Sequence, residues 1–85
     1  MKNTREQLAA EYEHFGVDLL FADGFDQAII GVDAVNFRVI YDYDTMVEVL
    51  ISDGMSKEES IEYLDFNVLC AYVGEQTPIY AYKAD

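Results

Sequence analysis

The amino-acid sequence predicts one α+β domain spanning residues 1–85, with a small antiparallel sheet of about three strands and two to three helices packed on one face. Two observations lead to this fold class. Residues 41–72 carry two successive helical periodicities joined by a glycine-containing turn. The segments on either side are short β-rich runs, and no repeated pattern of strand, long crossover and strand indicates a parallel sheet. A chain of 85 residues is short for a domain, so a single thin core is expected.

The N-terminal segment predicts a first helix over residues 5–14. Thr4 followed by Gln7 fits a capping box, and apolar residues recur behind it at helical spacing. Gly16 is expected to end this helix. Residues 16–26 contain a strong Asp-Gly turn signal, so we expect an irregular connection there that includes at most one helical turn.

Two β-rich runs predict an antiparallel hairpin. Residues 27–33 form an apolar run that could be buried on both faces, and residues 37–43 alternate apolar and polar side chains. Residues 33–36 are short enough to form the connecting turn. Gly31 marks either a β-bulge or a close approach of another backbone, and a merely tolerated glycine is an equal alternative.

The stretch after the hairpin predicts the first of two paired helices. Asp42 or Asp44 is expected to accept hydrogen bonds from the first free backbone amides, and Gly54 is expected to end the helix in a left-handed conformation. The apolar face of this helix is predicted to consist of Met46, Val47, Leu50 and Ile51.

A second helix is predicted directly after this turn. Ser56 and Glu59 have the spacing of a capping box. The apolar stripe is predicted to consist of Ile61, Leu64, Val68 and either Ala71 or Tyr72. Gly74 is expected to close the helix. Residues 77–82 then predict a third strand, whose Pro78 favours an edge position or a strand start.

The charge balance excludes several classes of function. The chain carries 17 acidic and 5 basic residues, for a net charge of −12. A field of this sign repels nucleic acid and anionic membranes, so we expect no direct nucleic-acid binding and no membrane binding. No apolar run approaches the length of about 18 residues that a membrane span requires, and no signal peptide is predicted. If the charge selects a partner, that partner is basic. The alternative is that the charge only keeps a small protein soluble.

The candidate catalytic and metal-binding residues lack partners of the right kind. Cys70 is the single cysteine and cannot form an intrachain disulfide, and its apolar neighbours predict a buried, unreactive thiol in a reducing intracellular compartment. Asp42, Asp44 and Glu48 could coordinate a divalent cation, but they do not match the spacing of a calcium-binding loop, and helix capping explains the two aspartates better. His14 has no evident nucleophile to activate. We therefore expect no enzyme activity, no cofactor and no bound metal.

The acidic surface of the helical pair is the remaining candidate site. Carboxylates on neighbouring elements of so small a domain are expected to lie at spacings comparable to those of phosphates along a nucleic-acid strand. A rigid acidic protein could therefore occupy a basic groove that normally holds nucleic acid. The acids predicted to be exposed and to contact such a partner are Asp42, Asp44, Glu48, Glu58, Glu62 and Asp65.

Four segments of the chain resemble a protein family. They read GFDQAIIGVD, RVIYDYDTMVEVL, DGMSKEESIEYLDFNV and AYVGEQTPIY, and the likeness covers about two-thirds of the chain. They are similar to a family of small uncharacterised acidic proteins encoded by tailed bacteriophages and prophages. The resemblance implies a phage accessory protein that acts in the cytoplasm of the host cell.

The resemblance and the charge together predict a non-enzymatic phage accessory protein that binds a host protein. Many small acidic phage proteins block host defence or nucleic-acid-handling proteins, some of them by imitating DNA. The expected target therefore has a basic surface, and a CRISPR effector is one example. The alternative is a structural or housekeeping phage protein that acts through self-association, as a homodimer formed by the edge of residues 77–82 and exposed tyrosines.

Overall fold

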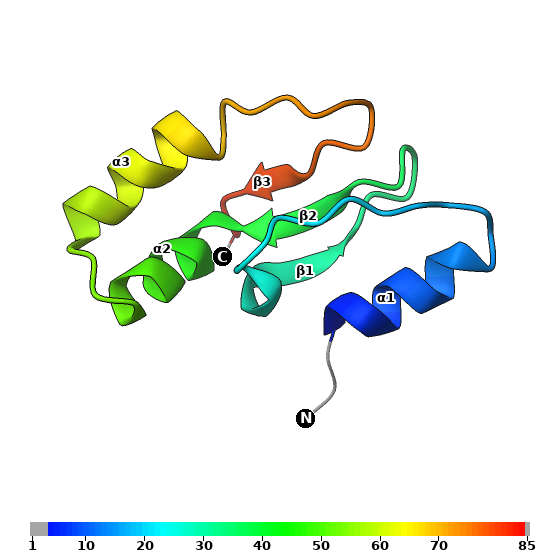
Figure 1. The fold of residues 1–85 in the computed structure, drawn as a ribbon, viewed down its shortest axis with the longest axis horizontal. Coiled ribbons are helices and arrows are strands. Elements are labelled where there is room, and N and C mark those ends of the chain that lie inside the picture. Colours follow the sequence, from blue (N-terminus) through cyan, green and yellow to red (C-terminus); the bar gives the residue numbers. More distant parts are fainter. Residues whose placement is uncertain (1–3, 85) are drawn as a thin grey trace.

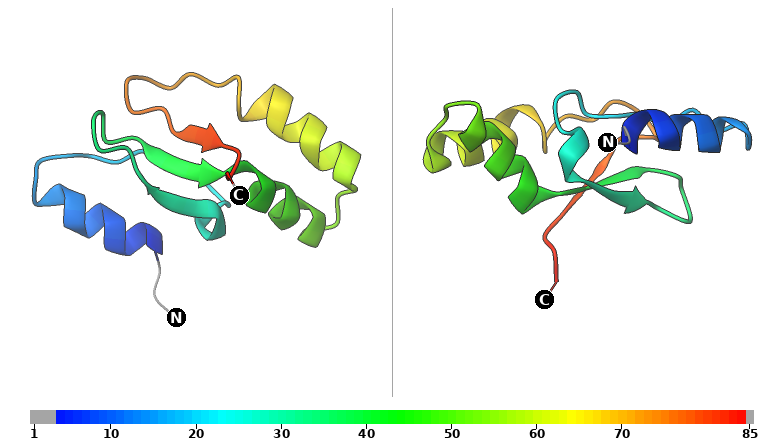
Figure 2. Two further views of the ribbon diagram at one scale, coloured as in Figure 1. Left: turned by 180° about the vertical axis from the view of Figure 1, so that it is seen from behind. Right: turned by 90° about the horizontal axis from the view of Figure 1, so that it is seen from below.

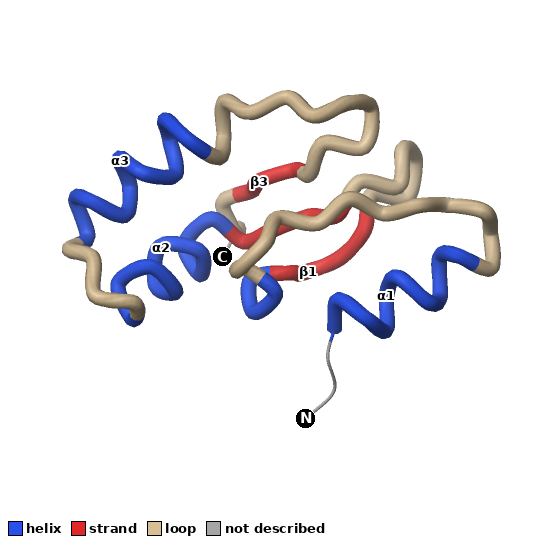
Figure 3. Tube along the Cα trace, viewed as in Figure 1, coloured by secondary structure: helices blue, strands red, loops and turns tan. Residues whose placement is uncertain are grey.

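The computed structural model describes residues 4–84, which form three α-helices, a short 3-10 helix and a three-stranded sheet (Figure 1). The elements in chain order are α1 (Thr4–Glu13), η1 (Asp26–Ala28), β1 (Ile29–Val32), β2 (Val39–Asp42), α2 (Tyr43–Ser52), α3 (Lys57–Asn67) and β3 (Ile79–Ala81). Long loops precede η1 and follow α3 (Figure 3). The predicted α+β class is confirmed. Thr4, predicted as a cap, is instead the first residue of α1.

The sheet has the strand order β1-β2-β3, with β2 in the centre. β1 and β2 are antiparallel, as predicted, but β2 and β3 are parallel. The prediction of a wholly antiparallel sheet is therefore wrong for β3. The reason is the long connection, because α2, α3 and the following loop carry the chain back to the end of the sheet where β2 starts. A long helical connection permits a parallel pairing of the two strands that it joins. One such connection does not produce the repeated pattern of strand, crossover and strand by which a parallel sheet is predicted from sequence.

The β1–β2 hairpin is held by its turn and interrupted by a bulge. The Asp33 carboxylate accepts hydrogen bonds from the amides of Val35 and Asn36 at 3.0 and 3.2 Å, a local contact that favours aspartate in turns. The strand register shifts between Ile29 and Gly31, which favours the bulge among the three alternatives left open for Gly31. A Cβ atom at Gly31 would meet no atom within 4 Å, so close backbone approach is not the role of this glycine.

The two paired helices form where they were predicted, with one difference in length. Gly54 adopts a φ of 109° just after α2, as expected for a left-handed helix end. Ser56 and Glu59 form the predicted capping box at the start of α3. However, α3 ends at Asn67 and does not continue to Gly74, so the predicted extent of this helix is wrong.

The early end of α3 follows from hydrogen bonds in its last turn. The amide of Val68 donates to the carbonyl of Leu64 at 3.0 Å, the normal α-helical bond, but the amide of Leu69 donates to the same carbonyl at 2.8 Å. This second bond has the wider i→i−5 spacing, so the regular α-helical pattern stops here. The Cys70 thiol donates to the carbonyl of Asp65 at 2.9 Å. Valine and cysteine are also weak helix formers. The predicted apolar stripe therefore stops here, and the side chains beyond it are exposed.

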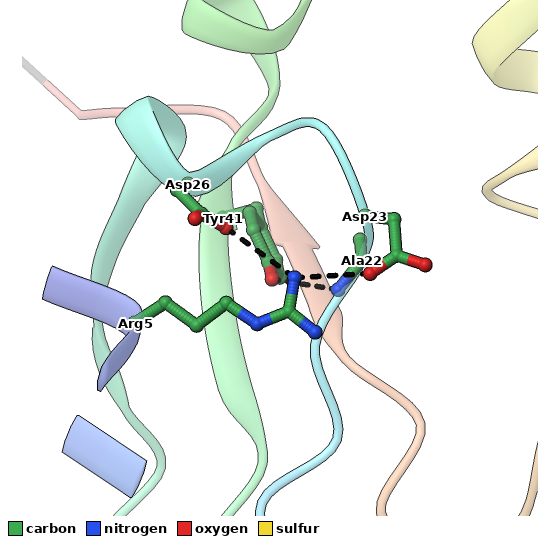
Figure 4. A network of polar contacts seen from close by, with 5 residues as sticks. All are labelled: Arg5, Ala22, Asp23, Asp26 and Tyr41. Atoms are coloured by element: carbon green, nitrogen blue, oxygen red, sulfur yellow. Dashed lines mark hydrogen bonds and ion pairs between the residues drawn. The ribbon is translucent and has the colours of Figure 1, made fainter. Parts of the chain in front are cut away.

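The core lies between the central strand, the helical pair and the loop before η1. Tyr41, Met46 and Leu64 are fully buried and come from β2, α2 and α3 respectively. The Tyr41 ring stacks on Tyr80 of β3 with 5.8 Å between centroids, and its hydroxyl accepts a hydrogen bond from the Ala22 amide at 2.7 Å (Figure 4). Burial raises the pKa of Tyr41 above its ordinary value. One tyrosine thus connects two strands and the covering loop.

The helices and the long loops gather on one side of the sheet, as predicted (Figure 2, right). Val39 and Tyr41 are fully buried on β2, and Tyr41 packs under the covering loop. Ile30 of β1 is half exposed, so the prediction that the first strand is buried on both faces is wrong. The physical reason is that no helix of the described chain covers the other face of the sheet.

α1 is attached to the rest of the molecule through a few side chains, and none of its residues is buried. Near its start, Arg5 donates a hydrogen bond to Asp23 at 2.9 Å and lies 3.8 Å from Asp26 (Figure 4). Near its end, the Tyr12 ring meets the Phe37 ring edge-on, with 6.0 Å between centroids. These contacts tie α1 to the loop before η1, to η1 and to the hairpin.

Candidate functional site

The structure exposes five of the six acids that were predicted to contact a partner. Asp44 and Glu48 lie on α2, and Glu58, Glu62 and Asp65 lie on α3. The two helices pack against each other beside the sheet (Figure 1). The five carboxylates therefore belong to one structural unit, and we refer to them as the helical-pair acids.

The sixth predicted acid, Asp42, is buried, with 5% of its surface exposed, so its assignment as a partner-binding residue is wrong. It is the last residue of the central strand, where neighbouring elements enclose it. Its Oδ2 accepts a hydrogen bond from the Thr45 hydroxyl at 2.6 Å, and its Oδ1 has no partner in the described chain. Asp42 occupies the N-cap position of α2, yet its side chain bonds no helix amide, so the predicted capping role is also wrong.

One further acid of α3 has a structural role. The Glu59 carboxylate accepts a hydrogen bond from the Ser56 amide at 2.9 Å, and the Ser56 hydroxyl accepts one from the Glu59 amide at 3.1 Å. The hydrogen bond from the Ser56 backbone is the main cause that lowers the pKa of the Glu59 carboxyl. No such contact involves Glu48, Glu58 or Glu62 within the part of the chain that the structure describes.

Asp65 links the two helices. Its Oδ1 accepts a hydrogen bond from the Tyr43 hydroxyl at 3.3 Å, and the Tyr43 ring meets the Tyr82 ring edge-on with 5.0 Å between centroids. Burial, together with the nearby charge of Asp65, raises the pKa of Tyr43. Tyr43 therefore stays protonated at neutral pH and donates to the carboxylate.

The basic residues of the described chain do not neutralise the helical-pair acids. Arg5 makes both ion pairs found there, and both join α1 to η1 and the loop before it. Arg38 donates hydrogen bonds to the carbonyls of Thr77 and Pro78, which hold the start of β3 against the hairpin. Lys57, exposed at the first position of α3, is the one basic residue in the sequence of the two helices. The helical pair therefore presents an excess of negative charge.

An apolar groove beside α3 was missed by reasoning from the sequence. It has a volume of about 280 Å³ and lies between α3, the loop before η1 and the start of β3. A second hollow of about 320 Å³ adjoins it, and Tyr63 and Asn67 line both. Tyr63 is 41% exposed, and Phe66, which lines the second hollow, is 77% exposed. The sequence held one signal, because these two aromatics have helical i, i+3 spacing outside the predicted apolar stripe.

The residues considered for catalysis or metal binding do not form a site. His14 and Cys70 are both exposed, so the prediction of a buried thiol is wrong; the end of α3 before Cys70 leaves this residue in a surface turn. Among residues 4–84, no cluster of histidine, cysteine, aspartate or glutamate side chains could hold a metal ion. No helix in the same range has the length and apolar character needed to cross a membrane. The surface instead presents charge and exposed apolar area.

No family model, curated protein or solved structure matches this chain. The resemblance to bacteriophage proteins therefore stays a prediction. Any functional assignment rests on the surface of the molecule itself.

Proposed function

We propose that this chain is a non-enzymatic bacteriophage accessory protein that binds a basic surface on a host protein, in the host cytoplasm. The proposal is carried by the exposure of the five helical-pair acids, which have no basic partner in the described chain. The net charge of −12 adds a long-range field of the same sign. Host proteins that handle nucleic acid, including defence proteins such as CRISPR effectors, have the complementary charge. The chain would inhibit such a protein by imitating DNA.

Electrostatic attraction of this kind acts mainly on the association rate and on the choice of partner. It is screened beyond about 10 Å in 0.1 M salt. The proposal therefore requires binding that weakens as the salt concentration rises. It also requires that nucleic acid compete for the same surface of the partner, because both ligands are polyanions.

The test compares two triple variants that change the net charge by the same amount. The helical-pair variant reverses three exposed acids without internal partners, by the substitutions Glu48→Lys, Glu58→Lys and Glu62→Lys. The control variant reverses three exposed acids on α1 and on the loop after α3, by the substitutions Glu11→Lys, Glu13→Lys and Glu75→Lys. Thermal melts establish that both variants fold.

Wild type and both variants are immobilised and incubated with bacterial lysate at about 50 and about 300 mM salt. Captured proteins are identified by mass. We expect wild type and the control variant to capture the same basic, nucleic-acid-binding protein at low salt and to release it at high salt or on addition of DNA. The helical-pair variant should capture much less. Capture that is equal for all three proteins, or lost equally in both variants, contradicts the proposal.

A second candidate is a structural or housekeeping phage protein that acts as a homodimer. The observation in its favour is that β3 lies at the edge of the sheet, next to the exposed Tyr82. Repulsion between two chains of charge −12 opposes this pairing. Size exclusion with light scattering separates the candidates. A stable dimer that is lost in Ile79→Lys supports self-association, and a monomer at high protein and salt concentrations rules it out.

A further inference from the structure

The groove beside α3 is apolar in its interior and acidic and aromatic at its outer end. Its walls include Phe21 from the loop before η1, Val68 from the turn after α3 and Tyr80 from β3. The adjoining hollow is lined by Glu62 and Phe66 of α3. Recessed apolar surface next to exposed rings and carboxylates is suited to a ligand that is itself both apolar and positively charged.

The spacing of residues on α3 defines what kind of positive charge fits. Glu62 and Phe66 are four residues apart and so share one face of the helix, and Tyr63 lies beside them at i, i+3 from Phe66. A guanidinium group can stack on an aromatic ring and donate hydrogen bonds to a carboxylate in the same plane. Lysine supplies the charge without the planar stacking, so arginine is the better match.

The loop that forms the opposite wall of the groove binds an arginine in this way, supplied by α1 of the same chain, although Arg5 itself does not line the groove. The Arg5 guanidinium lies 4.9 Å from the centroid of the Phe21 ring. It also lies 2.9 Å from the Asp23 carboxylate, a contact that Figure 4 shows. Phe21 and Asp23 both line the groove. An acid near an aromatic ring thus occurs on both sides of the groove, and on the α3 side no arginine of the described chain occupies it.

We infer that this groove binds an amphipathic segment of the partner protein, with an apolar anchor flanked by arginines. The inference rests on the proposed function and specifies the chemistry of the partner. The anchor fills the space between Val68 and Tyr80, and an arginine stacks on Phe66 and pairs with Glu62. A second copy of this chain is a poor occupant, because it carries a charge of −12 and both of its arginines, Arg5 and Arg38, are held by internal contacts.

Fluorescence anisotropy with labelled synthetic peptides tests this inference. The probe is a helix-forming peptide of alanine, leucine and arginine, and the comparison peptide has lysine in place of every arginine. Phe66→Ala removes the exposed ring on α3. Phe15→Ala is the matched control, because Phe15 is 74% exposed and follows α1, which lies far from α3 in the fold (Figure 1). Neither substitution changes the charge, and thermal melts establish that both variants are folded.

We expect the arginine peptide to bind wild type and Phe15→Ala equally. It should bind Phe66→Ala about tenfold more weakly, the loss that follows removal of a central aromatic contact. The lysine peptide should bind wild type several-fold more weakly than the arginine peptide. Equal affinity of wild type and Phe66→Ala, or of the two peptides for wild type, would overturn the inference.

A nuclear magnetic resonance titration of the full chain with the arginine peptide locates the binding site. Peak shifts at Tyr63, Asn67 and Val73 support the groove, and shifts confined to the sheet contradict it. Capture of a host protein that depends on the helical-pair acids but not on Phe66 would retain the proposed function and reject this inference. Peptide binding that depends on Phe66, without salt-sensitive capture of any host protein, would support this inference and reject the proposed function. A dimer of wild type that Phe66→Ala dissociates would assign the groove to a second copy and overturn the inference.

Discussion

The buried carboxylate of Asp42 depends on the hydroxyl of Thr45. This hydroxyl donates to Oδ2 at 2.6 Å, and Oδ1 has no partner among the described residues. A buried acceptor that loses its donor costs about 1–3 kcal/mol. We therefore expect Thr45→Val to lower the free energy of unfolding by about 1–3 kcal/mol in urea denaturation. Thr45→Ser keeps the hydroxyl and should lose less than about 1 kcal/mol. Equal losses in the two variants would show that the hydroxyl is not what supports Asp42.

Asp42 and Asp44 also show where sequence reasoning fails at the residue scale. Both have the residue type and position of helix caps, and both were expected to be exposed. The chain passes from β2 to α2 without a loop, so Asp42 ends a buried strand, while Asp44 is exposed within the first turn of the helix. Sequence patterns place such boundaries only to within a residue or two. In this case that uncertainty decides whether a carboxylate is buried.

Among the secondary-structure elements, α3 begins with a capping box that contains a titratable group. Hydrogen bonds from Ser56 lower the pKa of Glu59 below its ordinary value of 4.5. A lowered pKa stabilises the fold above the unfolded-state pKa, and this contribution disappears as the pH falls through the folded-state pKa. Glutamine can replace glutamate in the box as a neutral acceptor.

We expect Glu59→Gln to lose less stability than wild type as the pH is lowered from about 6 to about 3, because it cannot be protonated. Urea denaturation across this pH range measures the difference. Glu58→Gln is the matched control, because Glu58 lies in the same turn and takes no part in the capping box. The same pH dependence in Glu59→Gln and Glu58→Gln would refute the role assigned to the box.

α1 is the helix with the weakest attachment, because none of its residues is buried and Arg5 makes the two ion pairs that join it to the loop before η1 and to η1 in residues 4–84. Exposed ion pairs contribute at most about 1 kcal/mol. We expect Arg5→Met to change global stability by less than about 1 kcal/mol while increasing hydrogen exchange in α1 alone. Lys57→Met removes an exposed cation elsewhere and should leave exchange in α1 unchanged. Undiminished protection of α1 in Arg5→Met would contradict this picture of its attachment.

Features that depend on residues close together in the sequence were predicted well, whereas features that depend on the path of the chain through the fold were not. The capping box of Ser56 and Glu59, the helix end at Gly54 and the bulge at Gly31 all depend on residues close in sequence. The direction of β3 depends on where the two helices and a long loop return the chain. No short pattern encodes that path, so the antiparallel expectation failed.

At the scale of the whole molecule, α3 contributes residues to both the acidic surface and the apolar groove. Its carboxylates contribute three of the five helical-pair acids. Its Tyr63 lines the apolar groove, and its Phe66 lines the adjoining hollow. The acids could be predicted because charge is visible in composition. The groove could not, because Phe21, Val68 and Tyr80 come from distant parts of the sequence and meet only in the fold.

The salt dependence of the dissociation constant tests most directly whether the helical-pair acids contact a basic partner. The captured partner is purified and titrated with wild type, the helical-pair variant and the control variant, from about 50 to about 300 mM salt. We predict equal, strongly salt-dependent binding for wild type and the control variant. At low salt the helical-pair variant should bind at least about tenfold more weakly than wild type, and its affinity should depend less steeply on salt. Identical affinities and salt dependences for the two triple variants would contradict the claim, because net charge alone would then explain the binding.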